Sequence, residues 1–130
     1  MSDTKDLSLK MATEQDVPLI LTFIKALAEY ERLADAVIAT EDGLRQTLFG
    51  ERPYAECVIA RVKGQPAGFA LFFHNYSTFL GRPGIYLEDL FVKPEHRGQG
   101  VGRALLRFLA RLAQERNLSL IHISEPTRPY

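Results

Sequence analysis

Apolar residues recur with two different periods near the start of the chain, and these periods predict a strand followed by a helix. Leu7–Met11 alternates weakly between apolar and polar residues and is expected to open a sheet. From Val17 to about Arg32, apolar residues recur at the three- and four-residue spacing of a helix that buries one face. Thr13, with Asp16 three residues later, is typical of a capping box at such a start. The predicted buried stripe is Val17, Ile20, Leu21, Ile24, Leu27 and Ala28.

The rest of the pattern predicts a second helix, three strands and a third helix. Thr40 is placed to cap a short helix that ends near Phe49, with Gly50 as its C-terminal glycine. A strand, Glu56–Val62, a hairpin turn, Lys63-Gly64, and a second strand, Ala67–Tyr76, follow. The loop Ser77–Gly84 then leads to a third strand, Ile85–Val92, which Lys93-Pro94 ends. The last predicted element is a helix that begins at Val101, and its buried stripe continues with Leu105, Phe108, Leu109 and Leu112. The predicted order is therefore β-α-α-β-β-β-α, in the α/β (α+β) class.

Composition and charge narrow the kinds of protein this chain can be. Its 130 residues, 46% apolar and 25% charged, are those of one ordinary globular domain. With a net charge of zero, there is no electrostatic argument for binding nucleic acid or an anionic membrane. The single cysteine, Cys57, suits a reducing compartment, and the polar N-terminus has no signal-peptide core. We expect a soluble, cytoplasmic protein with no membrane span.

The last thirteen residues differ in character from the rest. Up to Asn117 the periodicity is consistent, whereas Leu118–Tyr130 looks like a translated sequencing-adapter tail. We therefore expect an incomplete domain at residues 1–117 and a non-native tail at residues 118–130. The alternative is a genuine short strand, Leu118–Ile123, followed by a proline-broken end.

A glycine-rich turn, Arg97-Gly98-Gln99-Gly100-Val101-Gly102, joins the last predicted strand to the third helix. Closely spaced glycines leave backbone N–H groups unobstructed at a helix N-terminus, where the helix dipole favours an anion. A dinucleotide-binding fingerprint would need glycine at position 103, which is Arg103, and a P-loop would need Gly-Lys-Ser/Thr. The spacing that remains is R-x-x-G-x-G. A turn that uses glycines only for packing is the alternative.

This pattern, after an acidic and apolar strand, resembles the acetyl-CoA pyrophosphate loop of the GNAT acetyltransferase superfamily. The resemblance implies a mixed, mostly antiparallel sheet with flanking helices, and acetyl-CoA as cosubstrate. It implies that the loop from Arg97 to Gly102 binds the pyrophosphate. It also implies that the backbone of Leu90, Phe91 and Val92 pairs with the pantetheine arm, and that one N–H group there polarises the thioester carbonyl.

Three stretches make the chain similar to diamine (spermidine/spermine) N-acetyltransferases within this superfamily. They are Leu21–Glu31, Cys57–Arg61 and Gly68–Leu106, the last of which contains Tyr86-Leu87-Glu88-Asp89. The similarity implies a small amine substrate, with a polyamine first and a lysine-like amino acid second, and a homodimer. A non-catalytic domain that binds acyl-CoA or forms dimers is the alternative of another class.

Acyl transfer to an amine needs a neutral nucleophile, and an alkylamine of pKa about 10.4 costs about 4.6 kcal/mol to deprotonate at pH 7. The resemblance makes Glu88 the general-base candidate and amine contact. Strand alternation puts Asp89 on the opposite face, unless the bulge that these proteins carry in this strand re-aims it. Tyr30 and Glu31 match positions that contact the polyamine. The alternative is structural. Tyr30 would then only cover the end of the helix, and the three acidic residues would be solvated side chains without a role in the reaction.

Other candidates favour structural interpretations. Arg103, Arg107 and Arg111 form a stripe that could attract the nucleotide phosphate, but a solvated helix face accounts for it as well. His74 and His96 have no metal-ligand spacing, so no metal site is expected, and Cys57 is expected to be a small buried hydrophobe. The family uses a later tyrosine as general acid and completes its cleft with further strands. Nothing after residue 117 matches these, so we expect weak catalysis and poor folding.

Overall fold

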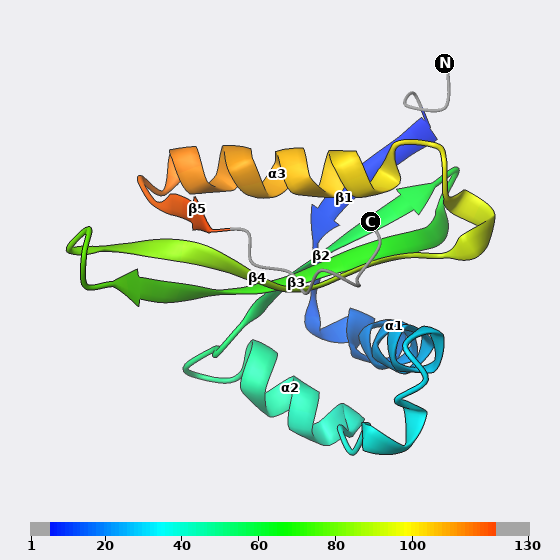
Figure 1. Cartoon of the computed structure of the whole chain (residues 1–130). Helices are drawn as coiled ribbons and strands as arrows, with labels where there is room; N and C mark the ends of the chain where they lie inside the picture. Colours follow the sequence, from blue (N-terminus) through cyan, green and yellow to red (C-terminus); the bar gives the residue numbers. More distant parts are fainter. Residues whose placement is uncertain (1–5, 122–130) are drawn as a thin grey trace.

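The computed structural model describes residues 6–121, in which five strands form one sheet in the order β1-β2-β3-β4-β5 (Figure 1). The strands β1 to β4 are antiparallel neighbours, and β5 runs parallel to β4. The predicted mixed, mostly antiparallel sheet and the order β-α-α-β-β-β-α are therefore confirmed. The bounds are β1 Leu7–Met11, α1 Val17–Tyr30, α2 Glu41–Phe49, β2 Glu56–Val62, β3 Gln65–Ser77, β4 Arg82–Val92, α3 Val101–Glu115 and β5 Ser119–Ile121.

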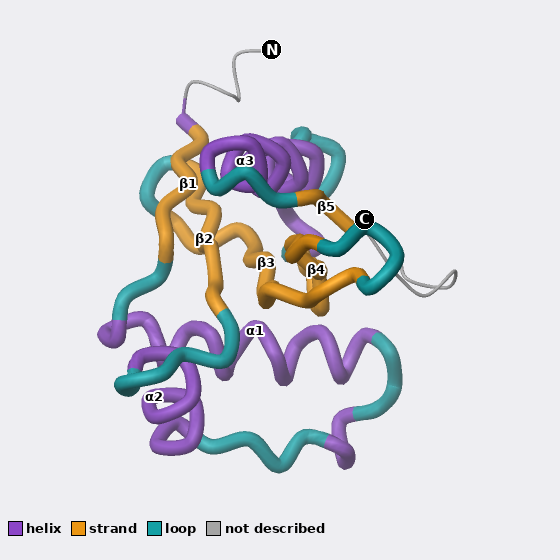
Figure 2. Tube along the Cα trace, turned by 90° about the vertical axis from the view of Figure 1, so that its left-hand side faces the viewer, coloured by secondary structure: helices purple, strands orange, loops and turns teal. Residues whose placement is uncertain are grey.

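Helices cover both faces of the sheet, and each face buries its own apolar cluster. Figure 2 shows the strands between α3 on one side and α1 with α2 on the other. Beneath α3, the buried residues include Leu105 and Leu109 of the helix against Phe72 and Leu87 of the sheet. On the opposite face, Phe23 of α1 stacks on the ring of Phe69 with centroids 5.2 Å apart; Ile20, Leu48, Ile59 and Phe91 belong to the same cluster.

The predicted helix starts are present in the structure. The carboxylate of Asp16 accepts a hydrogen bond from the backbone N–H of Thr13 at 2.8 Å, which is half of the predicted capping box. Between them lies one 3-10 turn, and α1 follows from Val17. At α2, the hydroxyl of Thr40 accepts from the N–H of Gly43 at 3.0 Å, as a capping threonine does.

The ends of two helices lie at residues in the left-handed conformation. Helix α1 ends at Tyr30 rather than at the predicted Arg32, because Arg32 has φ 61° and the N–H of Leu33 donates to the carbonyl of Ala28. Asn117 ends α3 in the same way, with φ 56°. Gly50 lies at the predicted C-terminal position of α2, but it does not have the left-handed conformation that usually explains a glycine there.

Gly50 is the C-cap of α2, yet its φ is −81°, so it does not supply a left-handed turn. A Cβ there would collide with the carbonyl oxygen of Gln46. Close backbone approach, rather than conformational freedom, is the reason for this glycine.

The β3–β4 hairpin is longer than the sequence predicts. The residues expected to form the loop Ser77–Gly84 pair instead across the sheet, with Ser77 opposite Arg82 and Asn75 opposite Gly84. Only residues 78–81 remain as the turn. These turn-forming residues belong to β4 because pairing with β3 provides their backbone groups with hydrogen-bond partners. Local propensity cannot predict such pairing.

Part of the predicted non-native tail belongs to the sheet. Ser119–Ile121 forms β5 and pairs with Gly84, Ile85 and Tyr86 of β4. The strand alternative therefore holds for these three residues, which extend the sheet beyond β4. Residues 122–130 lie outside the described residues, and a domain boundary at residue 117 stays a prediction.

Candidate functional site

The glycine-rich turn lies over the N-terminus of α3 and lines a cavity of about 500 Å³. Gly98 and Gly100 both have φ +82°, a conformation that glycine adopts without strain, and a Cβ at either would meet only open space. These two reversals carry the chain from β4 into α3. The lining residues are Val92, His96, Arg97, Gly98, Gly100, Val101, Gly102, Arg103 and Leu106.

Hydrogen-bond donors at this turn are available to an anion. Within residues 6–121, no backbone carbonyl accepts a hydrogen bond from the amides of residues 98–103. Two buried side-chain atoms beside them, Oε1 of Gln99 and Nδ1 of His96, also have no hydrogen-bond partner. Buried polar atoms are costly when unpaired. The amides, and not the acceptor oxygen of Gln99, therefore make the turn fit a pyrophosphate, and the residues predicted to bind it are brought together.

Arg97 connects this turn to the end of α1. Its Nε donates to the carbonyl of Val92 at 2.9 Å, and its guanidinium lies 4.7 Å from the ring centre of Tyr30 and 5.8 Å from that of Phe91. A predicted cofactor residue and a predicted substrate residue therefore contact each other. Sequence reasoning missed this cation–π contact because no spacing signal links the two segments.

A β-bulge in β4 determines how the two central carboxylates are arranged. Leu71 of β3 pairs with Asp89, but its neighbour Phe72 pairs with Leu87, so Glu88 is the extra residue. Leu87 and Leu90 both belong to the cluster beneath α3. Glu88 follows the first of these and Asp89 precedes the second, so strand alternation sends both toward the α1 face. Without the bulge, strand alternation would place Glu88 and Asp89 on opposite faces of the sheet. The bulge therefore decides the alternative that the sequence left open for Asp89.

Exposure differs between the predicted site residues. Glu88 is exposed and Asp89 is half-buried, while Leu90, Phe91 and Val92 are buried as core residues. Tyr30 is 48% exposed at the end of α1, and Glu31 beside it is half-buried. The four acidic or aromatic candidates are thus partly or fully exposed, whereas the side chains of the three β4 residues belong to the core.

The backbone of β4 is only partly paired on the side of β5. Pairing between the two strands covers Gly84, Ile85 and Tyr86, and in the described residues it stops there. Among residues 6–121, no strand pairs with the second edge of the following stretch of β4, from the bulge to Val92, and an extended ligand can pair with such an edge. On its other edge Gly68 is essential, because a Cβ there would lie 2.5 Å from the carbonyl oxygen of Phe91. No local sequence signal indicates this close approach.

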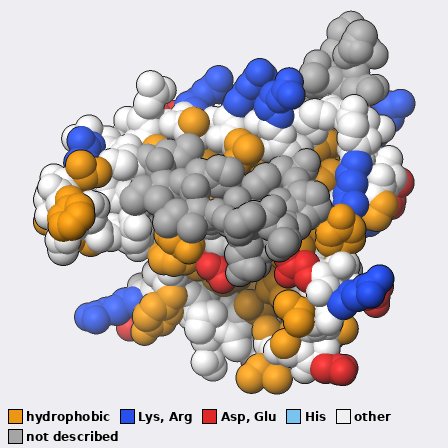
Figure 3. Space-filling view, viewed as in Figure 1, with side chains coloured by type: hydrophobic (Ala, Val, Ile, Leu, Met, Phe, Trp, Pro, Cys, Tyr) orange, Lys and Arg blue, Asp and Glu red, His pale blue; other side chains and the backbone are white. Residues whose placement is uncertain are grey.

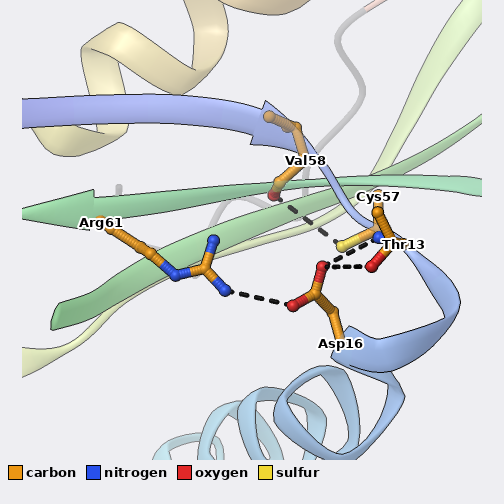
Figure 4. A network of polar contacts seen from close by, with 5 residues as sticks. All are labelled: Thr13, Asp16, Cys57, Val58 and Arg61. Carbon is orange, nitrogen blue, oxygen red and sulfur yellow. Dashed lines mark hydrogen bonds and ion pairs between the residues drawn. The ribbon is translucent and has the colours of Figure 1, made fainter. Parts of the chain in front are cut away.

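A polar network holds the start of α1 against the sheet (Figure 4). The guanidinium of Arg61 on β2 lies 3.1 Å from the carboxylate of Asp16, which also binds Thr13. Cys57, beside it on β2, is 3% exposed, and burial together with the charge of Asp16 raises the pKa of its thiol. Cys57 is therefore the buried hydrophobe that was predicted, in a site that disfavours a thiolate.

The arginine stripe of α3 faces away from the core. Figure 3 shows Lys and Arg side chains gathered along this helix. Arg103, Arg107 and Arg111 are all exposed, as a solvated face predicts, and Arg103 also lines the cavity at the glycine turn. Among the described residues, no three metal-ligating side chains are grouped, and no helix there is long and apolar enough to cross a membrane.

The model of the acetyltransferase (GNAT) family matches residues 23–129, which is more than half of the chain. The chain belongs to the GNAT family. Members of this family are acyltransferases that use an acyl-CoA cosubstrate. This N-acetyltransferase has relatives with different named substrates.

One relative of this GNAT protein is thialysine N-epsilon-acetyltransferase from Bos taurus, 39% identical over 124 residues; the match covers 89% of this chain and 72% of that protein. Another is the human spermidine/spermine N(1)-acetyltransferase-like protein 1, 32% identical over 121 residues, covering 88% of this chain and 17% of that protein. A solved aminoglycoside acetyltransferase from an uncultured soil metagenomic sample superposes with a TM-score of 0.80 at 16% identity, over 97% of this chain and 82% of that one. This last likeness shows the fold alone.

Proposed function

We propose that this GNAT domain transfers the acetyl group of acetyl-CoA to a primary amine of a small diamine, by direct attack in a ternary complex. The observation that carries the proposal is the bulge in β4, through which Glu88 and Asp89 share one face of the sheet. Two carboxylates on one face favour a substrate that carries more than one positive charge.

Glu88 is the proposed general base, and Asp89 is proposed to attract the second ammonium group. An exposed carboxylate on the strand that leads into the glycine turn can accept the proton of the attacking amine, directly or through a water molecule. Glu31 and Tyr30, at the end of α1, would complete the binding site for the amine. The thioester carbonyl would be polarised by a backbone N–H group of β4.

Acetyl-CoA would be bound by backbone rather than by side chains. The amides of Gly98 to Gly102 would hold its pyrophosphate, and the second edge of β4 near Leu90, Phe91 and Val92 would pair with its pantetheine arm. Arg97 would keep the turn in place through its bond to the carbonyl of Val92.

A polyamine is the first proposed substrate, and a lysine-like amino acid is the second. The second is favoured by the match to the bovine thialysine acetyltransferase, which extends over 72% of that protein. Both substrates place a second cation several bonds from the reacting amine, which the pair Glu88 and Asp89 would recognise. We further propose that the protein acts in the cytoplasm, in keeping with its single buried cysteine, and as a homodimer.

The test is acetyl transfer from acetyl-CoA to spermidine, to thialysine and to butylamine as a matched monoamine. We expect kcat/KM for spermidine or for thialysine to exceed that for butylamine by about tenfold or more, since a hydrogen bond between a carboxylate and the second ammonium group contributes about 1.5–3 kcal/mol. Equal rates for all three amines would contradict the diamine proposal. Saturable acetyl-CoA binding without turnover of any amine would favour the non-catalytic binding domain instead.

A further inference from the structure

Charge is distributed unevenly between the two sides of the sheet. The segment between β1 and β2, residues 12–55, contains α1 and α2 and holds eight acidic and four basic side chains. The segment between β4 and β5, residues 93–118, contains α3 and holds two acidic and six basic side chains. Figure 2 shows α3 on one side of the sheet and α1 with α2 on the other. The neutral chain therefore has a positive side and a negative side.

The exposed face of α3 carries three of these positive charges in a row. Arg103, Arg107 and Arg111 are all exposed at four-residue spacing, and no acidic residue occurs from Val101 to Gln114. Among the residues that the structure describes, no carboxylate lies within ion-pair distance of any of the three. Their charges are therefore available to a ligand in solution.

An unpaired row of arginines is unfavourable for the helix itself. Like charges four residues apart on a helix repel each other, and a cation in the first turn also opposes the helix dipole. Elsewhere the chain pairs arginines with carboxylates, as in Arg61 with Asp16 and Arg116 with Glu56. A local conflict of this kind, left without compensation, is typical of a functional surface.

The row of arginines leads to the glycine turn. Arg103 lines the cavity at that turn, and the helical rise places Arg107 and Arg111 about 6 and 12 Å farther along the axis of α3. CoA carries a phosphomonoester besides its pyrophosphate, and so has about four negative charges at pH 7. The charge of this surface is therefore complementary to that of the cosubstrate.

We propose that Arg107 and Arg111 steer acyl-CoA toward the glycine turn, raising its rate of association without holding it once bound. This rests on the proposed acyl-CoA site at the turn, but not on which amine is acetylated. Exposed charges at the rim of a site act mainly on the association rate, because they attract the ligand at long range while water screens their contacts in the complex. The acidic side chains of residues 12–55 would attract a cationic amine to the opposite side of the sheet.

The test is stopped-flow binding of a fluorescent etheno-adenine analogue of CoA to the full chain. The double variant Arg107→Gln, Arg111→Gln should lower the association rate constant about threefold or more at about 10 mM ionic strength, where the Debye length is about 30 Å. The dissociation rate constant should stay unchanged. At about 1 M ionic strength, where the Debye length is about 3 Å, variant and wild type should associate at the same rate.

Two controls separate charge from other effects of the substitutions. The double variant Arg107→Lys, Arg111→Lys keeps both charges and should associate like wild type. Arg52→Gln removes one charge from an exposed position between α2 and β2, within the acidic segment, and should not slow association. Thermal unfolding checks the fold, and the double glutamine variant should be at least as stable as wild type because like-charge repulsion on α3 is relieved.

The same measurements also give the results that would overturn the steering role. One is an association rate constant that the double glutamine variant leaves unchanged. Another is a loss that lies in the dissociation rate constant and persists at high ionic strength, since that would show direct contact with the bound cosubstrate. Failure of the wild type to bind CoA would overturn the acyl-CoA site and the steering role together. Binding of CoA without acetylation of any amine would contradict only the proposed function.

Discussion

The guanidinium of Arg97 lies 4.7 Å from the centre of the Tyr30 ring, so the glycine turn before α3 rests on the end of α1. The same arginine is tied to β4 through the carbonyl of Val92. One side chain thus joins the segment proposed to bind acetyl-CoA to the segment proposed to bind the amine. We therefore predict that the two proposed binding events are coupled through this contact.

Replacing Tyr30 by leucine should weaken acetyl-CoA binding, although Tyr30 is outside the glycine turn. A cation–π contact at a half-exposed site contributes about 0.5–1 kcal/mol, so the dissociation constant should rise about two- to fivefold by calorimetry. Tyr30→Phe keeps the aromatic face and serves as the control, with cofactor affinity near wild type. If both variants bound acetyl-CoA alike, the coupling through Arg97 would be wrong.

Gly100→Ala should lower acetyl-CoA affinity through the backbone alone. Because Gly100 has φ +82° and open space around its Cα, alanine costs about 1–2 kcal/mol of conformational strain without a clash. The matched control is Gly64→Ala in the β2–β3 turn, where φ is +79° and the space is equally open. Both variants should lose similar thermal stability, and only Gly100→Ala should lose cofactor affinity. A parallel loss in Gly64→Ala would show a global effect.

Glu88→Gln should lower kcat by about a hundredfold or more, in line with removal of a general base. The acetyl-CoA dissociation constant should stay unchanged, since the side chain is directed toward the α1 face rather than into the glycine turn. Glu95→Gln, at an exposed position just before the turn, is the control and should keep full kcat. Unchanged kcat in Glu88→Gln would remove this residue from the reaction.

The pair formed by Glu56 and Arg116 should make stability depend on pH in the acid range. The hydrogen bonds and charge of Arg116 hold the pKa of Glu56 below its usual value, against the opposing effect of burial. A carboxyl group with a lowered folded-state pKa contributes stability above its unfolded pKa, near 4.5, and loses it as pH falls through the folded value.

Urea unfolding of wild type and Glu56→Gln measures this contribution. At pH 7 the variant should be less stable by about 1 kcal/mol, a low figure because both side chains remain about 30% exposed. The difference should shrink toward zero as the pH is lowered well below 4. Glu51→Gln, an exposed glutamate, should follow wild type throughout. A difference that stays constant with pH would mean that packing, not charge, stabilises this contact.

Most elements could be predicted from local sequence, and the errors share a cause. The strands Leu7–Met11 and Glu56–Val62 have the predicted bounds, because alternation and turn residues are local signals. The hairpin turn Lys63-Gly64 is also present, with both residues at positive φ. The extension of β4 back to Arg82 was missed, since it depends on pairing with β3 and β5. Ile24 is only partly buried, whereas Phe23 is buried by stacking on Phe69 across the core.

The sequence by itself determined the order of the elements, the glycine turn at the start of α3 and the family to which the chain belongs. Hydrophobic periodicity and motif spacing are properties of residues that are close in the sequence, so they can be recognised without a structure. Only the tertiary structure decided that Glu88 and Asp89 share a face, that Arg97 rests on Tyr30 and that β5 joins the sheet. Each of these depends on the register between segments far apart in the chain, and a shift of one residue in that register turns a side chain to the opposite face.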